Sequence, residues 1–145
     1  MRRGFTLVVA AMLAFAGCQQ ETKVSDSDIP ILDIEELDAA MADSFVVLVD
    51  VRKPDAYAAG HLPNAINIYL PDIRGRDPRL ANAKRIVVYA KHVRDPLGVA
   101  AAKRMIAMGY INVQEFKGGV AEWERAGRSL VGALPEAEIR PDTDR

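Results

Sequence analysis

The amino-acid sequence predicts an α/β domain in which helices cover both faces of a parallel β-sheet. Two observations favour this fold class. Short apolar runs rich in Val and Ile alternate with segments of helical spacing over about 100 residues. The runs at residues 45–51 and 86–89 are almost continuously apolar, which is typical of strands that a parallel sheet buries on both faces. The sequence shows neither an internal repeat nor a second domain.

The first elements of the domain are a short strand and a capped helix. Residues 29–33 form a brief apolar run that suits a strand. Asp33 can cap the helix that follows, and Glu36, three residues on, completes a capping box. Residues 45–51 then give the strongest strand pattern in the chain, and we expect this strand at the centre of the sheet.

A short helix and a third strand come next. Pro54 suits the first position of a helix, and Gly60 ends it. A turn that contains His61 leads to a strand at residues 65–68. Residues 70–80 are polar and basic and contain two prolines and a glycine, so we expect a loop there.

The functional interpretation depends on residues 85–110. They predict a strand at 86–89, a loop, and a helix that begins at Pro96 and is capped by Gly109. A loop between a parallel strand and a helix N-terminus presents backbone N–H donors, which favours an anion site. The loop offers no Cys, Ser or Thr as a nucleophile, because it consists of Ala90, Lys91, His92, Val93, Arg94 and Asp95.

The last elements are a fifth strand and a short helix. Residues 112–116 alternate as a strand does, and a turn through Gly118 and Gly119 leads into a helix at residues 120–125. Residues 133–145 are polar and contain two prolines, so we expect a disordered tail.

The N-terminus has the composition of a targeting segment. Arg2 and Arg3 precede an apolar stretch of signal-peptide length that is too short to span a bilayer comfortably. The stretch ends in small residues followed by Cys18, which resembles the lipobox of bacterial lipoproteins. The resemblance implies a signal peptide at residues 1–17 and a lipid anchor on Cys18. A plain secretory signal and an uncleaved anchor are the alternatives.

The expected location of the mature chain in the cell follows from this resemblance. We expect a lipid-anchored protein that faces the periplasm from a polar tether at residues 18–28. Gln19, rather than Asp, after the lipidated residue implies the outer membrane if the source is Gram-negative.

The composition excludes several functional classes. A formal net charge of −1 and the absence of aromatic residues among the basic ones give no indication of nucleic-acid binding. With a single cysteine the chain can form neither a disulfide framework nor a Cys-x-x-Cys site. No group of residues has the spacing of metal ligands, so we expect neither a metal nor a cofactor.

Three stretches resemble one family, in order and spacing. They are LVDVRKPDAYAAGHLPNAINI at residues 48–68, GYINV at 109–113 and KGGVAEW at 117–123. The first is similar to the rhodanese pattern DVR…E-[YF]…GHIPGAINI, and the other two resemble its ending, GY-x-NV…L-x-GG-x-x-x-W. The resemblance implies the rhodanese-like fold, a five-stranded parallel sheet flanked by helices, which we assign to residues 29–132.

The resemblance also implies where the active site would lie. In catalytic members, the loop after the fourth strand begins with a Cys that carries the transferred sulfur as a persulfide. That position is Ala90 in this chain, and the last loop position is Asp95, whose carboxylate would oppose an anion. Four residues near this loop are expected to order the site: Asp50, Arg52, Gly118 and Gly119.

Our first hypothesis is a membrane-anchored, catalytically inactive rhodanese-like module that binds or scaffolds. Its partner would be a small oxyanion or a protein that docks on the basic loop. Basic residues are frequent from residue 74 to 94, where the single acid is Asp77: Arg74, Arg76, Arg79, Lys84, Arg85, Lys91 and Arg94. The alternative is a thiosulfate or sulfane-sulfur transferase that uses an atypical thiol or one supplied by a partner. A free, reactive Cys18 is a third hypothesis.

Overall fold

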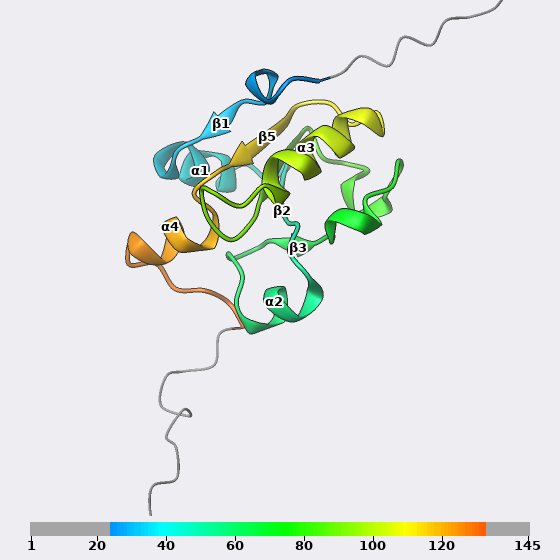
Figure 1. Ribbon diagram of the computed structural model, residues 1–145. Helices are drawn as coiled ribbons and strands as arrows, with labels where there is room; N and C mark the ends of the chain where they lie inside the picture. Colours follow the sequence, from blue (N-terminus) through cyan, green and yellow to red (C-terminus); the bar gives the residue numbers. More distant parts are fainter. Residues whose placement is uncertain (1–23, 133–145) are drawn as a thin grey trace, which may run out of the picture.

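The structure, a computed structural model, describes residues 24–132 and contains a five-stranded parallel sheet (Figure 1). The spatial order of the strands is β1-β5-β4-β2-β3. Their bounds are β1 Ile31–Leu32, β2 Val46–Asp50, β3 Ile66–Asn67, β4 Arg85–Tyr89 and β5 Val113–Phe116. The predicted α/β class and its parallel sheet are therefore confirmed.

Helices cover both faces of this sheet. Within residues 24–132 there are four α-helices: α1 Ile34–Met41, α2 Pro54–Ala59, α3 Leu97–Ala107 and α4 Gly119–Arg125. Residues of α3 pack on one face, together with the short turn η2, Leu70–Asp72, and the end of η3, Pro78–Leu80. Residues of α1 and α4 pack on the other face, where the side chain of Tyr57 from α2 joins them.

The two central strands carry the most deeply buried part of the core. Val49 of β2 pairs with Val88 of β4, and both side chains are fully buried. Val87, whose side chain points to the opposite face, is fully buried as well. Burial of such a side chain stabilises the folded state by about 1.5–3 kcal/mol. Because both faces of these strands are buried, apolar residues occupy nearly every position of the two runs.

Local capping fixes the ends of two helices as the sequence predicts. The Glu36 N–H donates to Asp33 Oδ1 at 2.8 Å, and the Asp33 N–H donates to Glu36 Oε2 at 2.9 Å, which completes the capping box before α1. After α3, Gly109 has a φ of +90°, and its N–H donates to the Ile106 carbonyl at 3.0 Å. This left-handed turn is the reason for a glycine at that position.

The N-terminal residues differ from the expected tether. Residues 24–28 belong to the domain, since Val24 packs against the α3 face and Asp26–Asp28 form a short 3-10 turn, η1. The Asp26 carboxylate forms an ion pair with Lys103 of α3. This contact could not be predicted from the sequence, because Asp26 and Lys103 are far apart in the chain. The rest of the expected tether, the signal peptide, Cys18 and the tail after residue 132 lie outside the described residues.

Candidate functional site

The loop after β4 is fixed at its start by α4. Ala90 is 4% exposed, and its carbonyl accepts the N–H of Val120 at 3.2 Å. The Lys91 carbonyl accepts the N–H of Ala121 at 2.9 Å. Gly119 allows this approach, because its φ is +60° and a Cβ there would lie 2.9 Å from the carbonyl carbon of Lys91. The expected glycine turn therefore lies directly against the first residues of the loop.

The carboxylate of Asp95 closes the loop from within. Its Oδ1 accepts the N–H of Leu97, the first residue of α3, at 3.0 Å. Its Oδ2 accepts the N–H of Lys91, at the other end of the loop, at 3.2 Å. Two donors that an external anion would use at a helix N-terminus thus already bind a carboxylate of the same chain. An anion that binds these two amides must displace Asp95.

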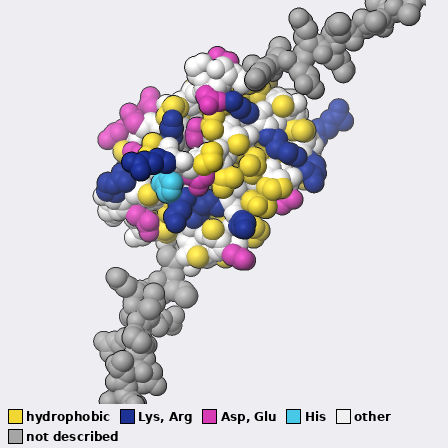
Figure 2. All heavy atoms as spheres, in the orientation of Figure 1, with side chains coloured by type: hydrophobic (Ala, Val, Ile, Leu, Met, Phe, Trp, Pro, Cys, Tyr) yellow, Lys and Arg dark blue, Asp and Glu magenta, His cyan; other side chains and the backbone are white. Residues whose placement is uncertain are grey.

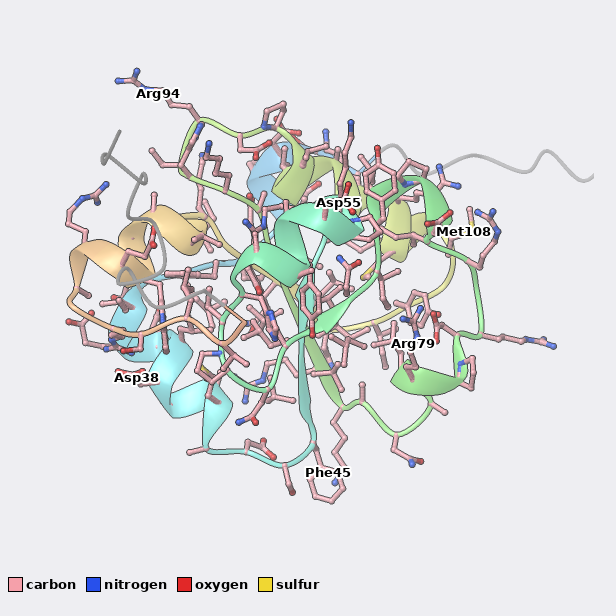
Figure 3. The ribbon with its side chains drawn as sticks, turned by 90° about the horizontal axis from the view of Figure 1, so that it is seen from below. Asp38, Phe45, Asp55, Arg79, Arg94 and Met108 are labelled. Carbon is pink, nitrogen blue, oxygen red and sulfur yellow. The ribbon has the colours of Figure 1, made fainter. Side chains whose placement is uncertain are left out.

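The other loop residues face solvent. The imidazole Nδ1 of His92 accepts the N–H of Arg94 at 3.2 Å, and the His92 carbonyl accepts the N–H of Asp95 at 2.8 Å. These bonds engage the amides of Arg94 and Asp95, while the side chains of Lys91, His92, Val93 and Arg94 stay exposed. Arg94 projects away from the domain (Figure 3). The loop therefore offers an apolar residue, Val93, among basic side chains.

A buried ion pair orders the neighbouring loop after β2. Asp50 is fully buried, and its carboxylate binds the guanidinium of Arg52 at 2.6–3.1 Å. The same guanidinium donates to the Gly60 carbonyl at 2.7 Å, which ties together the two ends of α2. Burial alone would lower the pKa of Arg52, but the hydrogen bonds and charge of Asp50 outweigh burial and raise it. The pKa of Arg52 thus lies above its usual value.

The sequence of residues 33–126 matches the family described as Rhodanese-like domain. The chain belongs to this family. The expectation drawn from the three sequence stretches is thereby confirmed at the level of the family.

Curated and solved relatives agree with this assignment. The rhodanese-like domain is 29% identical over 101 residues to a sulfurtransferase of Allochromatium vinosum, which covers 69% of this chain and 92% of that protein. It is 34% identical over 91 residues to the adenylyltransferase and sulfurtransferase UBA4 of Candida albicans. That match covers 53% of this chain but spans only 19% of UBA4. The crystal structure of the BH2092 protein from Bacillus halodurans superposes with a TM-score of 0.67 at 28% identity, covering 72% of this chain and 78% of that one.

Two residues of this rhodanese-like domain that hold the site together were missed in the sequence. The Tyr89 hydroxyl accepts the N–H of Leu62 at 3.1 Å, and burial, followed by the nearby charge of Asp50, raises its pKa. The Asn67 amide donates to the carbonyls of Asp50 and Arg52, both at 2.9 Å. The register of the parallel strands could have indicated both residues, because Tyr89 and Asn67 are the neighbours of Asp50 on the two adjacent strands.

The basic residues of the rhodanese-like domain do not gather at one loop mouth, and that expectation is wrong. Lys91 and Arg94 follow β4, whereas Arg85 begins it, so the five residues of the strand separate them by about 17 Å. Figure 3 places Arg94 and Arg79 on opposite sides of the domain. In Figure 2 basic side chains likewise lie on both sides of an apolar central area.

Partners within the chain already occupy several of these basic side chains. Arg79 pairs with Asp77 at 2.6 Å, and Lys84 lies 3.8 Å from the ring centroid of Phe45. The basic residues before β4 and those after it therefore do not form one positive surface. The exposed positive charges of the loop after β4 are Lys91 and Arg94.

The described residues hold no set of three or more His, Cys, Asp or Glu side chains placed to bind a metal ion.

Within residues 24–132, His61 stacks on the ring of Tyr57 at 3.8 Å between centroids, and its Nδ1 lies 2.9 Å from the Tyr57 carbonyl. Its backbone pairs with Val131. These contacts make His61 part of a packed turn.

Proposed function

We propose that this chain is a lipid-anchored, non-catalytic rhodanese-like module that binds a partner through residues 90–95. The observation that carries the proposal is the Asp95 carboxylate, which accepts the two loop amides beside Ala90 and α3. A loop that holds its own anion and contains no thiol is poorly suited to carry a transferred sulfur. By resemblance, Ala90 stands where catalytic members have their cysteine.

The chemistry of the loop face supports an acidic partner segment. Lys91 and Arg94 are exposed and pair with no acid among the described residues, and Val93 between them is 57% exposed. Exposed cations around an apolar side chain suit a protein segment that carries both carboxylates and an apolar residue. A free oxyanion suits the loop less well, because it must compete with Asp95.

The lipid anchor is proposed from the sequence. Cys18 follows a signal-like segment, and it lies outside the described residues. None of the helices within residues 24–132 has the length and apolar character needed to cross a bilayer. Anchoring through Cys18, facing the periplasm, would therefore rest on acylation. Labelling with palmitate tests it: the wild-type chain should incorporate label and Cys18→Ser should not.

A thiosulfate:cyanide assay on the purified chain tests the absence of catalysis. The relatives named as sulfurtransferases make transfer through a partner's thiol the rival function, so the assay is run with and without added glutathione. We expect no turnover above the buffer control in either case. Turnover that depends on the protein would overturn the proposal.

Titration with an acidic peptide tests the binding face. Hexaglutamate with one leucine inserted should shift the backbone amide resonances of residues 91–94 in a saturable way, and added salt should weaken the effect. The double charge reversal of Lys91 and Arg94 to Glu should abolish it. Reversal of Arg76 and Lys84, at the far end of β4, is the matched control and should leave binding unchanged. Equal loss in both variants would show that only net charge matters.

A further inference from the structure

Glu115 of β5 is a buried carboxylate without a partner among the described residues. It is 5% exposed, and neither a hydrogen bond nor an ion pair reaches its side chain from residues 24–132. Asp50, the other buried acid, is in contrast fully paired with Arg52. Most of the Glu115 residue is buried, but its carboxylate oxygens are not among the fully enclosed atoms that lack a partner within residues 24–132, so the carboxylate keeps some access to solvent. A partly desolvated carboxylate with no counter-ion in contact favours a cation that can reach it.

The first turn of α3 leaves room for this carboxylate. A Cβ on Gly98 would collide with Glu115 Oε1 and would lie 3.1 Å from its carboxyl carbon. Gly98 has ordinary helical geometry, so its backbone conformation does not require glycine. The absence of a side chain at Gly98 leaves this space to the end of the Glu115 side chain.

A cleft of about 210 Å³ opens beside Glu115. Ile31 of the edge strand β1 and Val93 of the loop line it, and both are unusually exposed for aliphatic residues, at 53% and 57%. Val99 of α3 adds a third aliphatic side chain to the wall. The cleft therefore combines aliphatic walls with one buried acid, an arrangement that ligand sites commonly use.

The other charged groups of the cleft are already engaged or lie at its rim. Asp26 pairs with Lys103, and Asp95 accepts the loop amides. Arg94 and Lys117 are exposed, and the nearest charged atom of Lys117 is beyond the 4.0 Å of an ion pair with Glu115. Burial raises the pKa of Glu115, while the charge of Lys117 opposes this and those of Asp26 and Asp95 add to it. Glu115 is thus the acid that lacks a counter-ion.

We propose that this cleft binds an alkylammonium group, with the ammonium at the Glu115 carboxylate and the alkyl stem between Ile31, Val93 and Val99. A lysine side chain carries such a group, and its methylene groups commonly lie along apolar surface while the charged end reaches a polar partner. This site shares Val93 with the loop face proposed above. It depends on Glu115 rather than on the charges of Lys91 and Arg94, so the charge-reversal and Glu115 variants distinguish failure of one proposal from failure of the other.

The test uses n-butylamine as the probe of the full chain, followed by backbone amide resonances. The amides of Gly98, Glu115 and Lys117 should shift in a saturable way with a Kd of roughly millimolar, as expected for so small a ligand. n-Butanol, which has the same stem without the charge, should cause no saturable shift. Similar shifts with both compounds, or none with butylamine, would overturn the proposal.

Two variants separate the carboxylate from general charge. Glu115→Gln keeps the shape of the side chain and should weaken butylamine binding at least tenfold. Glu124→Gln removes an exposed carboxylate from α4 and should leave binding unchanged. Unweakened binding by Glu115→Gln would refute the site. A tripeptide with a central lysine, blocked at both ends, then identifies the source: tighter binding than butylamine indicates a protein lysine, and weaker binding a small amine.

Discussion

Replacement of Asp95 by Ala should both destabilise the domain and open the loop to anions. The Leu97 N–H bond is partly buried at a helix N-terminus, where loss of such a cap costs about 1 kcal/mol. The Lys91 N–H bond is exposed, so its loss costs only about 0.5 kcal/mol. The sum of about 1.5 kcal/mol corresponds to a fall in Tm of roughly 6–12 °C for a domain of this size.

Sulfate distinguishes an opened loop from a merely weakened one. In Asp95→Ala the freed amides should bind sulfate, and saturation to about ten times the Kd should restore roughly 1.4 kcal/mol. Thermal unfolding of the purified protein with sulfate, compared with chloride at equal ionic strength, measures this effect. The wild-type protein should gain only the general stabilisation that sulfate gives most proteins.

Asp55→Ala is the matched control for this experiment. Asp55 also lies in the first turn of a helix, α2 (Figure 3). No hydrogen bond joins its carboxylate to another of the described residues. It should lose little stability and gain no sulfate binding. The reasoning is refuted if Asp95→Ala melts with the wild type, or if sulfate stabilises all three proteins equally.

Three further predictions concern the loop, the glycine turn and the buried acid. Ala90→Cys should place a thiol at the start of the loop, but mass spectrometry after exposure to thiosulfate should find no added sulfur atom, because Asp95 still holds the amides of Lys91 and Leu97; one added sulfur atom would contradict the closed loop. Gly119→Ala should cost roughly 3 kcal/mol in urea denaturation, since a positive φ and a steric clash combine there. Gly127→Ala, with φ +73° but open space, should cost only about 1 kcal/mol. Glu115→Gln should be more stable than the wild type at about pH 7. Because the folded-state pKa of Glu115 is raised above 4.5, the wild type loses stability as pH rises through that pKa, and the advantage of the variant should shrink towards about pH 4. An advantage independent of pH would contradict this.

Local sequence signals predicted the elements of this fold well. The capping box of Asp33 and Glu36 and the turn at Gly109 depend on residues within a few positions of one another. The apolar runs of β2 and β4 likewise follow from their burial on both faces. Such features need no knowledge of which distant segments meet.

The site was harder to predict because its contacts join distant segments. Asp95 was expected to oppose an anion, but only the structure shows its carboxylate bound to the amides at both ends of the loop. The bond between Leu62 and Tyr89 spans 27 positions and has no local pattern. In the sequence, Glu115 is an ordinary residue of an alternating strand. That its side chain lies against Gly98 of α3 is known only from the structure.

The error over the basic residues could have been avoided from the sequence. The run from residue 74 to 94 passes through a whole strand, and a strand carries its two ends to opposite edges of a sheet. Charge density along a chain therefore predicts a surface patch only where no extended element interrupts it.

The attachment of Val24 and Asp26 to α3 would, with the proposed lipid anchor, limit the distance between the domain and the membrane. If Cys18 carries lipid, six residues from 18 to 23 separate it from the folded part, and even fully extended they span only about 20 Å. The domain would then sample a shallow layer of the periplasm with its α3 side towards the bilayer. Asp26 also lines the cleft beside Glu115. If the chain is anchored in this way, a molecule that binds in this cleft would do so close to the membrane, which would favour partners that are themselves held at the membrane surface.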